Sequence, residues 1–516
     1  MDENGLRFLL DESSSKQLVS RLKALKLPRG AARRKTLRNI YLDTPDHALN
    51  KAEIALRLRR EGRRWLQVAE GRGGRTDAAP GAADQEVPAP GGRARLDAIP
   101  DPGLREEVLQ RVNGTAVVPF GESVIQRSTT EVSLGDGTRV ALAIDVGRIR
   151  AEGRSAELRE AEIALIEGDS GGIFDLARVL FPEGGLAFSQ LPLSARAYML
   201  AEEGRIEPAL AARNAGAAGV EPAWIAERAA RDCLRDCLGQ IATNILVVCR
   251  LDDAEGPHQL RVGLRRLRSV FSAYKSALSS PEMATLNGEA RWLGKQVGAL
   301  RDLDVVAGDI IGKEAARHPD EPALAALADA LARQAAERRQ EVRRLLVGQR
   351  SQSFLIDLAQ FIETRGWLVP ADFEQTARLA TPVVKLAVRS LNKRWKKVSK
   401  AARGLEMLDA EHRHALRKEL KKLRYGVEFF GPLFPERRLD AFLKRLKKLQ
   451  TVFGDLNDAA TMRHLFAGPD AYGAADPAAQ RAVGWVIGAG EARAEVSWSH
   501  AQDLWRDLDD QRPFWR

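Results

Sequence analysis

One stretch of the sequence occurs twice, and this repetition constrains the fold more than any other feature. Residues 258–268 read HQLRVGLRRLR, and residues 414–424 read HALRKELKKLR. A second motif follows each copy at the same distance, as GALRDLD from residue 298 and as GDLNDAA from residue 454. Two motifs that recur in the same order, about 156 residues apart, indicate an internal duplication.

Each copy is predicted to form an amphipathic helix. At about 100° of rotation per residue, the histidine and three basic residues of a copy fall on one narrow stripe beside an apolar stripe. The basic stripes consist of His258, Arg261, Arg265 and Arg268, and of His414, Arg417, Lys421 and Arg424. The apolar stripes consist of Leu260, Leu264, Leu267 and Phe271, and of Leu416, Leu420, Leu423 and Val427. One side of each helix is expected to pack and the other to carry charge.

The crowding of like charge on these stripes has two explanations. Like charges four residues apart destabilise a helix, so an anionic ligand is the expected compensation. The alternative is a solvated basic face that nearby carboxylates neutralise, and the candidates are Asp302, Asp304, Asp455 and Asp458. The matched repetition of the stripe favours the anionic ligand.

These motifs, with RDLD at residues 301–304 and GDLND at residues 454–458, resemble the two halves of a CHAD domain, an α-helical domain named for its histidines. The resemblance covers residue 222 to the C-terminus. It implies two pseudo-symmetric helical bundles whose basic faces bind inorganic polyphosphate, with no cofactor required. The implied polyphosphate-binding residues are His258, Arg261, Arg265, Arg268, Lys393, Arg394, Lys397, His414, Arg417, Lys421, Lys422, Arg424, Lys444 and Lys448.

The distribution of charge agrees with a polyanionic partner for the second part of the chain. The protein has a net charge of +10, from 80 basic and 70 acidic residues. Residues 1–210 hold 31 of each kind, which leaves 49 basic against 39 acidic residues in 211–516, so the excess lies entirely there. Such a field attracts phosphate chains in a salt-dependent way. Nucleic acid is a less expected partner because the stripes lack interleaved aromatic residues that stack on bases.

Cysteine usage and hydropathy indicate the compartment. The three cysteines, Cys233, Cys237 and Cys249, lie in one amphipathic stretch and are expected to be reduced, packed thiols. No apolar run approaches the roughly 18 residues of a membrane span, and the first residues lack a basic segment followed by an apolar one. The sequence predicts a cytoplasmic protein without a membrane partner, and the resemblance allows association with polyphosphate granules.

The first 200 or so residues follow strand periodicity. Arg57 and Arg59 share one face of a short alternating run, and Glu160 and Glu162 share one face of a later run. Strands with charge on one face suit an antiparallel barrel with a charged lumen, although solvent-exposed faces would give the same pattern.

Residues 41–62, YLDTPDHALNKAEIALRLRREG, and residues 193–198, LSARAY, resemble the CYTH or triphosphate-tunnel family. This resemblance covers residues 1–203 and implies an eight-stranded tunnel. In that family, basic residues hold a triphosphate and acidic residues hold Mg²⁺ or Mn²⁺. Residue by residue, the implied phosphate ligands are Arg7, Arg57, Arg59 and Arg127, and the implied metal ligands are Glu3, Glu86, Asp145, Glu160 and Glu162.

Four positions depart from the tunnel pattern. Gly5 and Ala164 stand where the family usually has acids, and Glu70 and Leu193 stand where it usually has lysines. Each loss removes a charge-assisted contact worth about 1.5–3 kcal/mol. The tunnel is therefore predicted to be degenerate, acting as a weak binder or a scaffold.

The sequence as a whole predicts an α+β multidomain protein. An eight-stranded antiparallel β-barrel occupies residues 1–203, a linker 204–221, and an all-α duplicated pair of helical bundles 222–516, with repeats at about 222–370 and 371–516. The expected function is binding of inorganic polyphosphate. The alternative is a triphosphatase or phosphoanhydride hydrolase in the tunnel, dependent on Mg²⁺ or Mn²⁺, with triphosphate as substrate.

Overall fold

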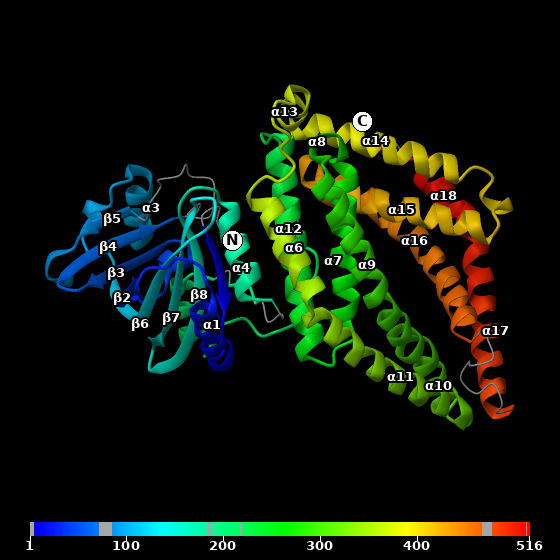
Figure 1. The fold of residues 1–516 in the computed structure, drawn as a ribbon. Coiled ribbons are helices and arrows are strands. Elements are labelled where there is room, and N and C mark those ends of the chain that lie inside the picture. Colours follow the sequence, from blue (N-terminus) through cyan, green and yellow to red (C-terminus); the bar gives the residue numbers. More distant parts are fainter. Residues whose placement is uncertain are drawn as a thin grey trace. The chain divides into compact units, whose positions relative to one another are not determined.

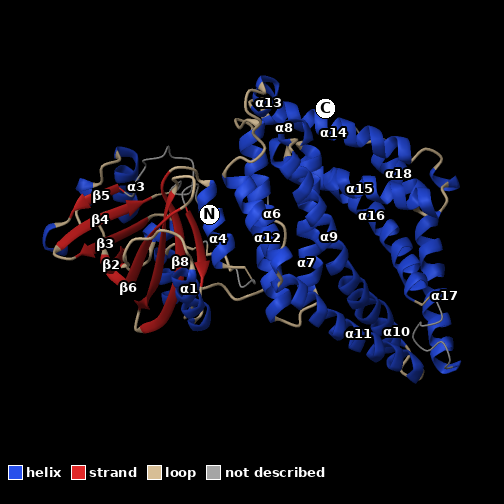
Figure 2. Ribbon diagram, in the orientation of Figure 1, coloured by secondary structure: helices blue, strands red, loops and turns tan. Residues whose placement is uncertain are grey.

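The chain folds into two compact units, Met1–Leu210 and Ala211–Arg516, in a computed structural model (Figure 1). The structure describes residues 5–71, 85–182, 187–189, 191–216, 219–466, 477–511 and 513–515. The first unit holds the strands and the second is helical (Figure 2). The predicted α+β organisation is confirmed.

The first unit is built on one sheet of eight antiparallel strands. The strands are β1 (Gly5–Leu9), β2 (Arg33–Asp43), β3 (Ala55–Glu61), β4 (Arg64–Glu70), β5 (Gln85–Pro88), β6 (Val118–Ser133), β7 (Arg139–Ala151) and β8 (Arg154–Glu167). Their order in the sheet is β1-β8-β7-β6-β2-β3-β4-β5. Pairing of β1 with β5 would close a barrel, and the described residues show no such pair.

Helices cover both faces of this sheet. They are α1 (Glu12–Ala24), α2 (Ala48–Lys51), α3 (Pro102–Val112), α4 (Gly171–Leu180) and α5 (Leu193–Glu203), with 3₁₀ turns η1 (Pro90–Gly92) and η2 (Leu96–Ala98). Tyr41 packs in one core with Ala197 and Leu200 of α5, whereas its neighbour Leu42 packs in another core with Val108 of α3. Because successive side chains of a strand point to opposite faces, α5 and α3 lie on opposite faces of the sheet.

The second unit consists of α-helices. They are α6 (Ala226–Arg250), α7 (Glu255–Ala273), α8 (Lys275–Leu278), α9 (Pro281–Asp304), α10 (Lys313–Arg317), α11 (Pro322–Val347), α12 (Gln349–Glu363), α13 (Phe373–Leu379), α14 (Val383–Ala401), α15 (Ala410–Phe430), α16 (Glu436–Leu465), α17 (Pro477–Ser499) and α18 (Ala501–Asp509). A π-helix, η3 (Val305–Gly312), extends α9, and η4 (Leu405–Met407) and η5 (Gly431–Leu433) are 3₁₀ turns. No described helix is both long and apolar enough to cross a bilayer.

The duplication is visible in the order of the helices. The first copy of the repeated motif forms α7, which packs between α6 and α9, and the second copy forms α15, which packs between α14 and α16. All eight residues of the two predicted apolar stripes are buried. Asp409 caps the start of α15 by accepting a hydrogen bond from the backbone N–H of His412. The two motif helices also contact each other, so the repeats meet along α7 and α15 (Figure 1).

Candidate functional site

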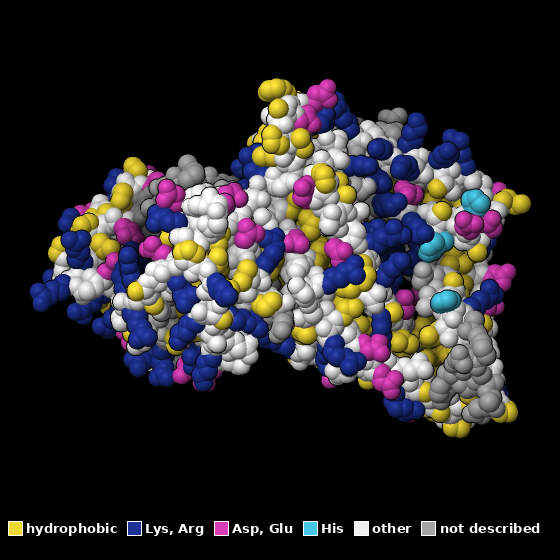
Figure 3. Space-filling model, viewed as in Figure 1, with side chains coloured by type: hydrophobic (Ala, Val, Ile, Leu, Met, Phe, Trp, Pro, Cys, Tyr) yellow, Lys and Arg dark blue, Asp and Glu magenta, His cyan; other side chains and the backbone are white. Residues whose placement is uncertain are grey.

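Basic side chains from both repeats meet where α7 contacts α15. The charges of Arg261 and Arg265 on α7 act directly on Arg417 and Lys421 on α15. These four residues are called the central cluster below. Figure 3 shows Lys and Arg side chains gathered on the visible face of the helical unit, with histidines nearby. The two stripes predicted from the sequence therefore lie opposite each other.

The central cluster changes the acid–base behaviour of its own members. Burial, together with the charges of Arg265, Arg417 and Arg261, lowers the pKa of Lys421 to about 6. Burial and the charge of Arg265 lower the pKa of Arg417 to about 10, although the carboxylate of Asp458 opposes this shift. Bringing these cations together without an anion thus costs free energy in the folded protein.

Internal carboxylates neutralise only part of the central cluster. The Arg261 guanidinium lies 2.6 Å from Asp302 and donates to the Gly298 carbonyl at 3.3 Å. Within the described residues, Arg265, Arg417 and Lys421 form no ion pair, and Arg417 Nε is buried without a hydrogen-bond partner.

The other carboxylates suggested as neutralising groups have different partners. Asp304 pairs with Arg339 at 3.0 Å, and Asp455 accepts a hydrogen bond from Ser497 at 2.5 Å. Burial raises the pKa of Asp458, the counterpart of Asp302 in the second repeat. The explanation by internal neutralisation therefore accounts for Arg261 but not for the rest of the central cluster.

The two motif histidines lie at the ends of the stripes. Burial and the charge of Arg301 lower the pKa of His258, and burial and the charge of Lys418 lower the pKa of His414. Both imidazoles are therefore predominantly neutral at pH 7. Arg301 belongs to the RDLD motif, but its position in the sequence does not indicate that its charge acts on the first histidine.

Several other predicted binding residues have protein partners. Arg268 donates a hydrogen bond to Asn287 at 3.3 Å, and Arg424 pairs with Glu428 at 3.2 Å. Glu419 pairs with Lys422 at 2.5 Å and lies 3.8 Å from Arg394. Arg394 also contacts Ser272. Lys393 and Lys397 are exposed on α14, and Lys444 and Lys448 are exposed on α16. These eight residues are therefore either partnered or solvent-exposed cations outside the central cluster.

One motif arginine has a structural role. Arg266 is buried, pairs with Asp236 at 2.8 Å, donates to Gln240 at 2.8 Å and lies over the ring of Phe429. Arg266 follows Arg265 directly in the sequence. The two side chains point to different environments, Arg266 toward α6 and Arg265 toward α15.

In the sheet unit, each predicted phosphate-binding arginine has a carboxylate partner. The pairs are Arg7 with Glu162 at 3.0 Å, Arg57 with Glu70 at 2.5 Å, Arg59 with Glu86, and Arg127 with Asp145 at 2.7 Å. Glu70 is the residue that replaces a family lysine. A carboxylate at this position therefore neutralises an arginine that the resemblance assigns to phosphate binding.

Three of the five predicted metal ligands belong to these same ion pairs. Glu3 lies outside the described residues. Glu86, Asp145 and Glu162 each pair with a tunnel arginine, and Glu160 pairs with Arg196 at 3.0 Å. Among the residues that the structure describes, no group of three acidic, His or Cys side chains is arranged to hold a metal ion.

Arg196 is a residue that the sequence reasoning passed over, although it lies within the LSARAY motif. Its side chain is fully buried, pairs with Glu160 and Glu207 and donates to Ser189. Two residues later, the Tyr198 hydroxyl donates to buried Asp43 at 2.7 Å, and burial raises the pKa of this tyrosine. The motif thus anchors α5 against the sheet in this structure.

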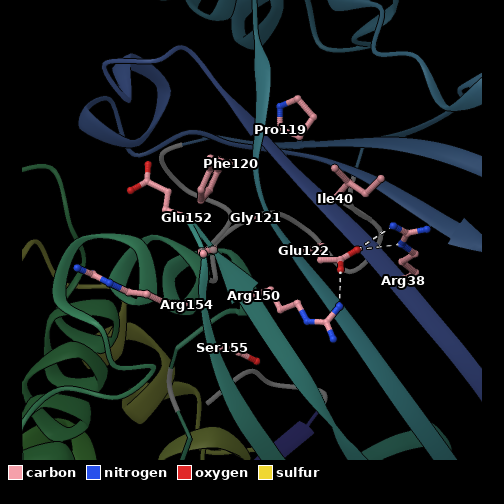
Figure 4. A pocket seen from close by; sticks show the side chains of 12 residues that line it. Arg38, Ile40, Pro119, Phe120, Gly121, Glu122, Arg150, Glu152, Arg154 and Ser155 are labelled. Atoms are coloured by element: carbon pink, nitrogen blue, oxygen red, sulfur yellow. Dashed lines mark hydrogen bonds and ion pairs between the residues drawn. The ribbon is translucent and has the colours of Figure 1, made fainter.

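A cavity in the sheet unit involves none of the predicted site residues (Figure 4). Glu122 lies between Arg38 and Arg150 and accepts hydrogen bonds from both, at 2.8 and 3.3 Å. Arg154 at its rim donates to the Leu200 carbonyl at the end of α5. The charged groups of this cavity are thus engaged with the protein itself.

Comparisons with known proteins identify both units. The CYTH domain model matches residues 3–198, and the CHAD domain model matches residues 232–467. An uncharacterised protein of Mycobacterium tuberculosis is 27% identical over 221 residues, which is 42% of this chain and 40% of that protein. This chain therefore spans less than half the length of that relative.

Two solved structures are similar to parts of the chain. The CHAD domain from the plant Ricinus communis is 25% identical, with a TM-score of 0.50 over 58% of this chain and 98% of that one. A protein of Hippeastrum with a dominant triphosphatase activity is 14% identical, with a TM-score of 0.25 over 40% of this chain and 97% of that one.

Proposed function

This chain contains a CYTH domain followed by a CHAD domain, and from that premise we propose that its helical unit binds inorganic polyphosphate through the central cluster. The pair of domains supports a role related to triphosphate or polyphosphate. One observation carries the proposal. The two repeats meet at the central cluster, and internal carboxylates leave most of its cations unneutralised.

A phosphate chain fits the chemistry of the central cluster. Guanidinium groups bind phosphate oxygens in a bidentate way, and a lysine adds a point charge. Phosphate oxygens would supply the hydrogen-bond acceptor that Arg417 Nε lacks. A long polyanion also releases counterions at each contact, and it can reach the exposed lysines of α14 and α16 beyond the central cluster. Binding would offset the repulsion that, together with burial, lowers the pKa of Lys421.

Polyphosphate and nucleic acid can be distinguished by direct comparison. The intact protein is expected to bind polyphosphate more tightly than single-stranded DNA or RNA at each salt concentration, because the central cluster offers guanidinium groups but no aromatic surface for bases. Fluorescence anisotropy with the three polymers across one salt series measures this. Equal affinity for all three at every salt concentration would favour a general polyanion binder over the proposed one.

For the sheet unit we propose a weak anion-binding or scaffolding role. Four arginines that the resemblance assigns to triphosphate already pair with carboxylates, so triphosphate would have to displace internal ion pairs. A triphosphatase dependent on Mg²⁺ or Mn²⁺ remains the alternative function, and it predicts fast release of phosphate.

Hydrolysis of inorganic triphosphate is expected to be slow with either metal, below the usual enzymic range of about 1–10³ s⁻¹. Glu70→Lys removes the carboxylate partner of Arg57 and restores a cation there, so it is expected to tighten triphosphate binding about tenfold or more. Phosphate-release assays and titration calorimetry measure the two effects. Glu106→Lys, at an exposed position of α3, is the matched change of charge. Rapid turnover that Arg57→Ala abolishes would instead establish the enzymic alternative.

A further inference from the structure

The two repeats place different cations at one equivalent position. Arg265 in the first motif corresponds to Lys421 in the second. An arginine side chain stays charged at any physiological pH, whereas a lysine can lose its proton when it is buried beside other cations. The central cluster therefore combines permanent charges with one charge that can be gained or lost.

Lys421 faces cations on two helices. Arg417, Arg424 and His414 flank it on α15, and Arg261 and Arg265 face it from α7. The carboxylates near the central cluster are Asp302 of α9, which pairs with Arg261, and Asp458 of α16, which acts on Arg417. Arg394 of α14 is directed to Glu419. Lys421 is half-buried in this position and has no ion-pair partner among the described residues.

We propose that Lys421 is the proton-accepting residue of the site, so that binding of a phosphate polyanion is coupled to the uptake of one proton by its amine. This inference rests on the polyphosphate-binding function proposed above. In the free protein, burial and the surrounding cations lower the pKa of the amine to about 6, so it is predominantly neutral at pH 7. A phosphate oxygen beside the amine reverses the local potential and favours the ammonium form.

The sign of the pH effect follows from this proton uptake. Below about pH 6 the amine is protonated in both free and bound protein, so Lys421 adds no pH dependence there. Above that pH, binding requires a proton, and affinity falls by up to about tenfold per pH unit until the bound amine also deprotonates. Binding is thus expected to be stronger in mildly acidic than in mildly alkaline solution.

Titration calorimetry measures the proton directly. The intact protein is titrated with size-fractionated polyphosphate at about pH 7.5, in buffers of low and high ionisation enthalpy, and the change in observed enthalpy between buffers gives the number of protons taken up. Lys421→Arg is expected to take up about one proton fewer and to keep its affinity as the pH rises. His258 and His414 are present in both proteins, so their contribution does not account for the difference.

Lys418→Arg is the matched control, because Lys418 is exposed on the same helix. It is expected to show the same uptake as the unchanged protein. Binding without proton uptake, or an uptake that Lys421→Arg leaves unchanged, would overturn the inference while leaving the polyphosphate-binding function intact.

A measurement without ligand separates the two proposals. In protein labelled with ¹³C at the lysine ε-carbon, the resonance that Lys421→Arg removes is expected to titrate with a midpoint near pH 6. Titration of this resonance near the ordinary lysine value of about 10.4 would sink the inference whether or not polyphosphate binds. If the Lys421 resonance titrates near pH 6 but the protein does not bind polyphosphate, the proposed function is rejected. The coupling of proton uptake to that ligand is then rejected with it.

Discussion

Replacing Arg265 and Arg417 together by glutamine is expected to weaken polyphosphate binding by about 10²–10⁴-fold at low salt. Each arginine provides charge-assisted hydrogen bonds worth about 1.5–3 kcal/mol, and neither has an ion-pair partner among the described residues that would compete for it. Removal of two phosphate contacts should also reduce the slope of log affinity against log salt by about 1.4. Titration calorimetry across a salt series measures both quantities.

The control for this pair is Arg333→Gln with Arg344→Gln, which removes two exposed charges from α11 of the same unit. It is expected to change affinity little, because α11 does not carry the central cluster. The single variants test whether the repeats form one site. If Arg417→Gln keeps full affinity at half the stoichiometry, the repeats bind independently and the shared site is wrong. If neither single variant changes binding, the stripes are solvated faces.

Lys421→Met is expected to stabilise the helical unit while weakening polyphosphate binding. In the unfolded chain a lysine has a pKa near 10.4, but in the folded protein the pKa of Lys421 is about 6. Folding at pH 7 must therefore release a proton, which costs free energy that methionine avoids. Allowing for partial exposure of the side chain, the gain should be roughly 2 kcal/mol, or about 3 °C in Tm.

The pH dependence identifies the origin of this gain. Between about pH 6 and 10 the unfolded lysine holds more protons than the folded one, so the unchanged protein becomes more stable as pH rises through this window. Lys421→Met lacks that rise, and its advantage should shrink toward pH 10. Thermal unfolding at a series of pH values tests this. Lys418→Met, on the exposed face of α15, should stay within about 0.5 kcal/mol of the unchanged protein. A Lys421→Met variant no more stable than this control would contradict the argument.

Spacing in the repeated motif was sufficient to predict much of the helical unit. Helical periodicity separated the apolar stripe, which is buried in both copies, from the basic stripe. The repeated motifs predicted two related sets of helices. The spacing could not tell which arginine finds a carboxylate. Arg261 reaches Asp302, whereas Arg417 and Asp458, at the equivalent positions, form no ion pair. That difference depends on how closely two helices approach, which the spacing of residues within either helix does not encode.

In the sheet unit, the sequence identified the departures from the tunnel pattern but not their consequences. Glu70 is recognisable as an acid in place of a lysine, yet its pairing with Arg57 depends on the register of β3 against β4, in which Ala55 lies opposite Glu70. Arg196 pairs with Glu160, 36 residues earlier in the chain. Such partners are set by the folded sheet and by the packing of α5.

The meeting of α7 and α15 within one chain has a consequence for how such a site can change during evolution. Two identical subunits around a two-fold axis must carry the same residue at both equivalent positions, so a substitution that alters one alters the other. Fusion of the halves into one polypeptide removes this constraint. One position can remain arginine while the other becomes lysine, as at Arg265 and Lys421. The binding residues of each half can then change independently of the other half.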